Sequence, residues 1–91
     1  MYKIVSSNQF KRDLKLAKKR GFDIELLSSV VNTLANGKTL DDKYRDHSLA
    51  GEYRGFRECH IEPDWLLIYR IESDELELFL FRTGTHSDLF K

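Results

Sequence analysis

The first half of the chain shows the hydrophobic spacing of two amphipathic helices. Phe10, Leu14 and Ala17 fall on one face of a segment that follows Ser7, a suitable N-cap, and ends near Arg20. The second segment starts after an N-cap at position 23, ends at the glycine at position 37, and has its apolar face at Ile24, Leu27, Val30, Val31 and Leu34. A connection this short, with a glycine at position 21, predicts an antiparallel helix hairpin.

From Gly51 onward the hydrophobic period changes to two, which is typical of strands. The predicted strands span residues 53–61, 65–71 and 76–83, and a further short strand is predicted at residues 2–5. Their tight turns predict an antiparallel meander. The polar segment 38–48 is irregular, with a helical turn expected near Leu40, and residues 86–91 are expected to form one helical turn.

This order of elements predicts an α+β fold in which the helix hairpin covers one face of the sheet. The other face is then expected to be free for a concave site. A chain of 91 residues is the length of one domain, so we expect a single domain over residues 1–91.

Composition narrows the class of protein. The chain has one cysteine, Cys59, so no intrachain disulfide can form and a reducing compartment is favoured. Because Cys59 falls in an alternating strand pattern, we interpret it as a buried small hydrophobe. The sequence shows no secretory or membrane segment, so we expect a soluble, cytoplasmic protein without membrane association.

Charge is unevenly distributed although the net charge is zero. Residues 1–46 hold 10 Lys and Arg against 6 Asp and Glu, whereas residues 47–91 hold 5 against 9. The basic half could approach an RNA backbone, but an ordinary solvated helix face explains it equally simply.

Histidines supply the candidate chemistry. His47, His60 and His86 all lie in the second half, each at a boundary of a predicted element. Boundary positions of neighbouring antiparallel strands can meet at one edge of a sheet, so we expect the three imidazoles to converge.

Three further residues are candidates, each with a structural alternative. Asp64 follows Pro63 in a stiffened turn and either serves the site or caps its own backbone. Trp65 either stacks on a base or belongs to the core. Arg82 ends an apolar strand and either contacts a phosphate or forms a salt bridge with a carboxylate.

Imidazoles, a carboxylate and a guanidinium suit RNA cleavage without a metal. A base removes the proton of the ribose 2′-OH, the oxygen attacks phosphorus, and an acid protonates the leaving 5′-oxygen. Arginine neutralises the charge that builds on the phosphoryl oxygens. Zinc bound by the histidines and Asp64 is the chemical rival, but the candidates lack zinc-site spacing, so we expect neither metal nor cofactor.

The segment DHSLAGEYRGFRECHIEPDWLLIYRI, followed by RTGTHSDLF, resembles the YafQ-type toxins of the RelE superfamily, found in bacterial type II toxin–antitoxin modules. The resemblance is strong over residues 46–90. It implies a RelE-like α+β fold, with an N-terminal strand and a helix hairpin packed on one face of an antiparallel sheet. It also implies an mRNA endoribonuclease that works on the 70S ribosome, and a cognate antitoxin similar to DinJ or RelB, typically with a ribbon-helix-helix DNA-binding end.

Carried over residue by residue, the family's positions fall on residues present in this chain. The implied catalytic residues are His47, His60, Asp64, Arg82 and His86, and the implied substrate-binding residues are Trp65 and Phe90. Our hypothesis places His60 and Asp64 near the 2′-OH, with His47 supporting the base and His86 as the acid. Arg82 would hold the scissile phosphate, and Phe90 would stack on a base or pack over the site. Exchanged acid and base roles remain open.

A non-catalytic reading belongs to another class of function. The same superfamily includes ParE-like toxins that bind and inhibit DNA gyrase without cutting RNA. Because those relatives lack this set of histidines, the nuclease reading is preferred, although a fold alone does not determine a function.

Overall fold

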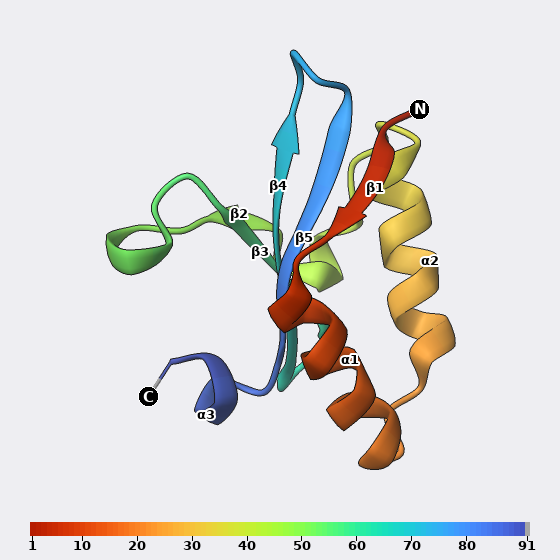
Figure 1. Cartoon of the computed structure of the whole chain (residues 1–91), viewed down its shortest axis with the longest axis vertical. Coiled ribbons are helices and arrows are strands. Elements are labelled where there is room, and N and C mark those ends of the chain that lie inside the picture. The colour runs from red at the N-terminus through yellow and green to blue at the C-terminus, as the bar shows by residue number, and fades with distance from the viewer. Residues whose placement is uncertain (91) are drawn as a thin grey trace.

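The computed structural model describes residues 1–90 (Figure 1). The elements, in chain order, are β1 (Lys3–Ser6), α1 (Asn8–Lys19), α2 (Ile24–Ala35), the 3-10 turn η1 (Asp42–Tyr44), β2 (His47–Ser48), the 3-10 turn η2 (Gly51–Tyr53), β3 (Arg57–Glu62), β4 (Trp65–Glu72), β5 (Glu77–Gly84) and α3 (His86–Leu89). The α+β class and the order of the predicted helices and strands are confirmed, and β2 is an additional strand in the segment that was predicted to be irregular. Lys91, the end of the predicted tail turn, lies outside the described residues.

The two long helices begin and end where the capping residues predict. The Ser7 side chain accepts a hydrogen bond from the Phe10 amide, and Asp23 accepts one from the Glu25 amide. Gly21, just beyond the end of α1, has a φ of 83°, a left-handed conformation that glycine adopts without steric cost. Both helices lie on the same side of the sheet (Figure 1).

The sheet has the order β1-β5-β4-β3-β2. β3, β4 and β5 form the expected antiparallel meander, but β1 pairs in parallel with β5, with Ile4 opposite Leu78. The sheet is therefore mixed rather than antiparallel. Because two helices intervene after β1, no hairpin turn constrains its direction, and a parallel pairing is open to it.

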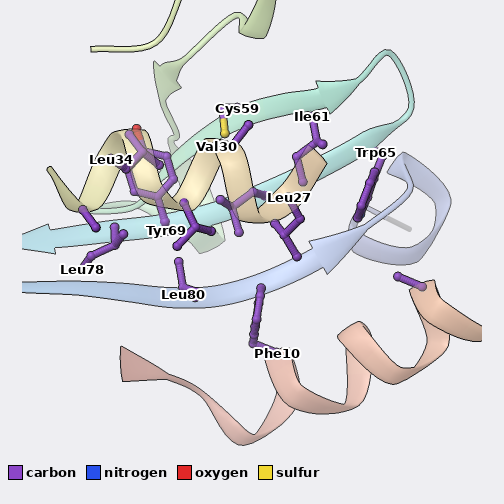
Figure 2. Packing of buried hydrophobic residues seen from close by; sticks show 14 residues of the cluster. Phe10, Leu27, Val30, Leu34, Cys59, Ile61, Trp65, Tyr69, Leu78 and Leu80 are labelled. Atoms are coloured by element: carbon purple, nitrogen blue, oxygen red, sulfur yellow. The ribbon is translucent and has the colours of Figure 1, made fainter. Parts of the chain in front are cut away.

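The main core lies between this sheet and the helices (Figure 2). Phe10 of α1 and the buried side chains of α2 pack against inward-facing residues of the strands, among them Leu67 and Leu80. Cys59 is fully buried here, as predicted, and burial raises the pKa of its thiol far above the ordinary value.

The opposite face of the sheet is not free, contrary to the prediction. A second apolar cluster covers part of it, built from Leu66, Ile68, Leu89, Leu49, Tyr53, Phe56 and Phe81. Figure 1 shows α3 and the loop around η2 on this side. The predicted strand 53–61 begins only at Arg57, because Gly51 and Gly55 adopt φ values of 66° and 91° and bend the preceding chain into η2.

Among the described residues, no helix combines the length and the apolar character that crossing a bilayer requires.

Candidate active site

Three separate elements bring the histidines together. His47 lies on β2, His60 on β3, and His86 begins α3. The ring centroids of His47 and His60 are 6.4 Å apart, and those of His60 and His86 are 5.6 Å apart. The expected convergence is therefore present. Its origin is strand register: β2 pairs with β3, and the β3–β4 turn approaches the end of β5.

Each imidazole is oriented by a contact of its Nδ1 atom. His47 Nδ1 lies 2.7 Å from the Arg45 carbonyl oxygen, and His60 Nδ1 lies 3.3 Å from the Pro63 carbonyl oxygen. A carbonyl can only accept, so in both rings Nδ1 is the donor. His86 Nδ1 lies 2.6 Å from Asp64 Oδ1. All three rings thus keep Nε2 as the nitrogen that can exchange a proton with a ligand.

Glu58 is a site residue that the sequence analysis missed. Its carboxylate is 6% exposed, and its Oε1 lies 3.5 Å from Nε2 of both His47 and His60. This buried carboxylate therefore lies between the two imidazoles. The sequence contained a signal for this residue: Glu58 and His60 are two positions apart on one predicted strand, so their side chains lie on the same face of the sheet.

Asp64 is coupled to His86. Its Oδ1 accepts hydrogen bonds from the His86 amide, at 2.9 Å, and from Nδ1. These two bonds, the backbone one first, lower the pKa of the Asp64 carboxyl. The turn between β3 and β4 points this carboxylate at the start of α3, so its partner in the site is His86. Its place near the 2′-OH stays a prediction.

Arg82 forms the salt bridge that was the alternative to a phosphate contact. Its Nε and Nη2 lie 2.8 and 3.2 Å from the two carboxylate oxygens of Asp13, on α1. This hydrogen-bonded pairing, above all, raises the pKa of the Arg82 guanidinium. Asp13 is buried and also accepts from the Thr83 amide, so the guanidinium is held at a fixed place beside the helix.

Trp65 belongs to the core, which contradicts its assignment as a substrate-binding residue. Its side chain is 2% exposed and lies among the core side chains of Figure 2. The indole packs on Phe22 at 5.0 Å between centroids, and its Nε1 donates to Thr83 Oγ1 at 2.9 Å. A side chain this deeply buried offers a base almost no surface to stack on. The general tendency of tryptophan to be buried was the better guide.

Phe90 remains at the surface beside the histidines. Its side chain is 42% exposed, and its ring centroid lies 6.5 Å from that of His86. Tyr53 supports the ring edge-on at 5.4 Å. An exposed aromatic in this position can stack on a base or cover a bound ligand.

A cleft of about 700 Å³ opens beside the histidines. Its lining comprises Leu26, Lys43, Tyr44, Arg45, His60, Ile61, Glu62, Pro63 and His86. The site therefore combines proton-transferring groups, an exposed aromatic ring and a concave surface with cationic residues.

A scan against protein families matches residues 2–91 to the model described as bacterial toxin of type II toxin–antitoxin system, YafQ. The chain belongs to the YafQ family. The mRNA interferase toxin YafQ of Escherichia coli K12 is 45% identical over 85 residues, covering 92% of this chain and 90% of the relative. Because the family and these relatives are YafQ toxins, the gyrase-binding alternative is not favoured.

Solved structures agree with this membership and with the RelE-like fold. A metal-bound toxin from Helicobacter pylori is 50% identical and superposes with a TM-score of 0.93, covering 99% of this chain and all of that one. YafQ from the E. coli DinJ–YafQ complex is 41% identical, with a TM-score of 0.90 and full coverage of both chains.

The metal-bound relative makes it necessary to test whether this site fits a metal. Within residues 1–90, no three His, Cys, Asp or Glu side chains form a group that could hold a metal ion. The donor set as placed does not fit a metal centre, so no step is derived through one.

Proposed function

We propose that this YafQ-family chain is an mRNA interferase, the toxin of a type II toxin–antitoxin module, and that residues 1–91 act as a single toxin domain. The observation that carries this proposal is the cluster of three imidazoles, each oriented through a contact of its Nδ1 atom. The E. coli relative that bears the name mRNA interferase supports the same activity.

The cleavage begins with the 2′-OH. His60, with His47 beside it, removes the proton, and the oxygen attacks the adjacent phosphorus. The imidazolium that forms is stabilised by Glu58, whose Oε1 lies 3.5 Å from Nε2 of both rings. Because either ring can carry the proton next to this carboxylate, His47 can share the role of base.

His86 is the proposed acid. Asp64 Oδ1 lies 2.6 Å from its Nδ1 and orients the ring, so that Nε2 can donate a proton to the leaving 5′-oxygen. The scissile P–O bond then breaks, leaving a 2′,3′-cyclic phosphate upstream and a 5′-hydroxyl downstream. No metal enters this sequence of steps.

Arg82 and Phe90 position the RNA. Asp13 engages Nε and Nη2 of Arg82, and we assign the remaining nitrogen, Nη1, to a phosphoryl oxygen, where a fixed cation stabilises the developing charge. Phe90, exposed beside His86, stacks on a base next to the scissile phosphate.

The proposed partners are a DinJ-like antitoxin, the 70S ribosome and its mRNA, in the cytoplasm. The antitoxin follows from the E. coli relative, whose complex with DinJ is known. The basic residues of α1 would face rRNA phosphates, and the ribosome would order the message for a protein whose net charge is zero.

The test is to map new 5′ ends on translated messages for the wild type, for His86→Ala and for Ser87→Ala, an exposed neighbour on α3. The wild type and Ser87→Ala should cut at the same sites, and His86→Ala should be at least about 10²-fold slower. Cleavage by His86→Ala within a few-fold of wild type would refute the acid role. Metal independence is tested on a short RNA without ribosomes, because ribosomes themselves need Mg²⁺. Cleavage of that RNA should be unchanged by EDTA, and its loss would refute metal independence.

A further inference from the structure

The cleft beside the histidines has a cationic wall that the proposed chemistry does not use. This wall is formed by η1 and the residue that follows it, and it contributes Lys43, Tyr44 and Arg45. His60 and His86 line the same cleft, so a chain bound at the imidazoles continues into it. The cleft volume of about 700 Å³ lies within the range of small-molecule sites and suffices for a nucleotide.

Both cations of this wall are available to a ligand. Lys43 and Arg45 are exposed, and within residues 1–90 neither side chain forms an ion pair or a hydrogen bond. Lys43 Nζ lies 5.1 Å from the centroid of the Tyr44 ring. A pair of unpartnered cations at the edge of a cleft attracts an anion such as a phosphate.

The position of the wall is fixed relative to the histidines. Arg45 has a φ of 49°, and its amide donates to the Asp42 carbonyl at 3.0 Å to end η1. Its own carbonyl accepts from Nδ1 of His47 at 2.7 Å. The backbone that carries the Arg45 guanidinium therefore also orients a histidine of the site.

The cleft also has an apolar side. Leu26 of α2 is 39% exposed, and Tyr44 is half-buried against the main core. One acidic residue, Glu62 at the end of β3, lines the cleft and forms no ion pair within the described residues. Its charge repels a phosphate and so favours placing the phosphate at the η1 wall, away from the end of β3.

We propose that this cleft binds a nucleotide of the RNA that flanks the scissile phosphate. Lys43 and Arg45 contact its backbone phosphate, and its base lies against Leu26 and Tyr44. The inference rests on the proposed nuclease function, because the cleft is assigned to the same RNA strand. The proposal adds a binding subsite to the nuclease site. Its residues would determine the affinity for RNA rather than the rate of proton transfer.

The first experiment measures steady-state cleavage of a short RNA or a translated message by Lys43→Ala, Arg45→Ala and the double variant. Lys3→Ala, an exposed cation on β1 that does not line the cleft, is the matched control. Each cleft variant should raise KM about ten-fold with kcat within two-fold of wild type, and Arg45→Lys should restore part of the loss. Lys3→Ala should behave as wild type.

The second experiment does not depend on cleavage. A trinucleotide with 2′-deoxy sugars is titrated into the protein while NMR follows the Leu26 methyl groups and the Tyr44 ring. The wild type should show shifts at both residues. The double variant should bind about 10²-fold more weakly. Its salt slope, log Kd against log salt, should be lower by about 0.7, because one phosphate is no longer neutralised.

The outcomes separate the two proposals. If the wild type cleaves RNA and the cleft variants keep wild-type KM and trinucleotide affinity, the subsite is refuted while the nuclease proposal stands. If the wild type binds the trinucleotide at this cleft but cleaves no RNA, the nuclease proposal fails alone. Shifts confined to other surfaces, or an equal loss in Lys3→Ala, would overturn the subsite.

Discussion

Replacing Trp65 with phenylalanine separates a structural role from a role in RNA binding. The indole is 2% exposed and donates to Thr83 Oγ1, which in turn donates to the Leu66 carbonyl at 2.7 Å. Phenylalanine removes this donor from a buried pair, at a cost of about 1 kcal/mol. The smaller ring also leaves a void beside Phe22, which costs about 1–2 kcal/mol more.

The expected loss is therefore about 2–3 kcal/mol of unfolding free energy. For a domain of this size, each kcal/mol lowers Tm by about 4–8 °C, so Tm should fall by roughly 10–20 °C. Thermal unfolding followed by circular dichroism measures this. The RNA cleavage rate, measured well below the lowered Tm, should stay within about two-fold of wild type, because a destabilised but folded core leaves the imidazoles in place.

Leu27→Ala is the matched control, because Leu27 is buried in the same core and its truncation costs about 2–5 kcal/mol. Both variants should lose stability and keep activity. The reasoning would be refuted if Trp65→Phe cut RNA more than ten-fold more slowly than Leu27→Ala while unfolding at the wild-type temperature, since that would place the indole on the substrate.

Three further predictions concern the residues that orient the site. Asp64→Asn should slow cleavage about 10²-fold, because His86 loses the carboxylate that orients its ring through Nδ1. Unchanged single-turnover rates would contradict this. Asp13→Asn should lower the free energy of unfolding in denaturant by about 1–3 kcal/mol and raise KM for RNA, because Arg82 loses its buried counter-charge. A variant with wild-type stability and wild-type KM would show that Asp13 does not position Arg82 for the RNA. The hydrogen bond from Arg20, above all, lowers the pKa of Asp88 in the folded chain. The stabilisation of α3 by this pair should therefore be complete above about pH 4, near the pKa of Asp88 in the unfolded chain, and be lost as the pH falls through the lower pKa of the folded chain. Asp88→Asn should remove this pH dependence, which NMR spectra of the α3 amides measure.

The sequence predicted the parts of the molecule that depend on local signals. Ser7, Asp23 and Gly21 marked the helix ends because capping is decided within a few residues. The meeting of the three histidines was also predictable, because short hairpins restrict where the ends of neighbouring strands can lie. His60 and His86 are 5.6 Å apart between ring centroids for this reason.

The remaining features depend on contacts between distant segments. The pairing of Arg82 with Asp13 joins residues far apart in the chain. From the sequence alone, Arg82 could either contact a phosphate or form a salt bridge with an unidentified carboxylate. Asp64 could not be assigned to His86 without the turn geometry. The second face of the sheet was expected to be open. It is covered because η2 and α3 fold back onto Leu66 and Ile68.

The chemical identity of the new RNA ends tests the central claim most directly, because attack by the 2′-OH leaves a cyclic phosphate whereas attack by water does not. A message cut by the wild-type chain is isolated, and its downstream fragment is labelled with and without prior phosphatase treatment. The account predicts a 5′-hydroxyl downstream and a 2′,3′-cyclic phosphate upstream. A 5′-phosphate with a 3′-hydroxyl would contradict it, since water rather than the ribose would then have been the nucleophile.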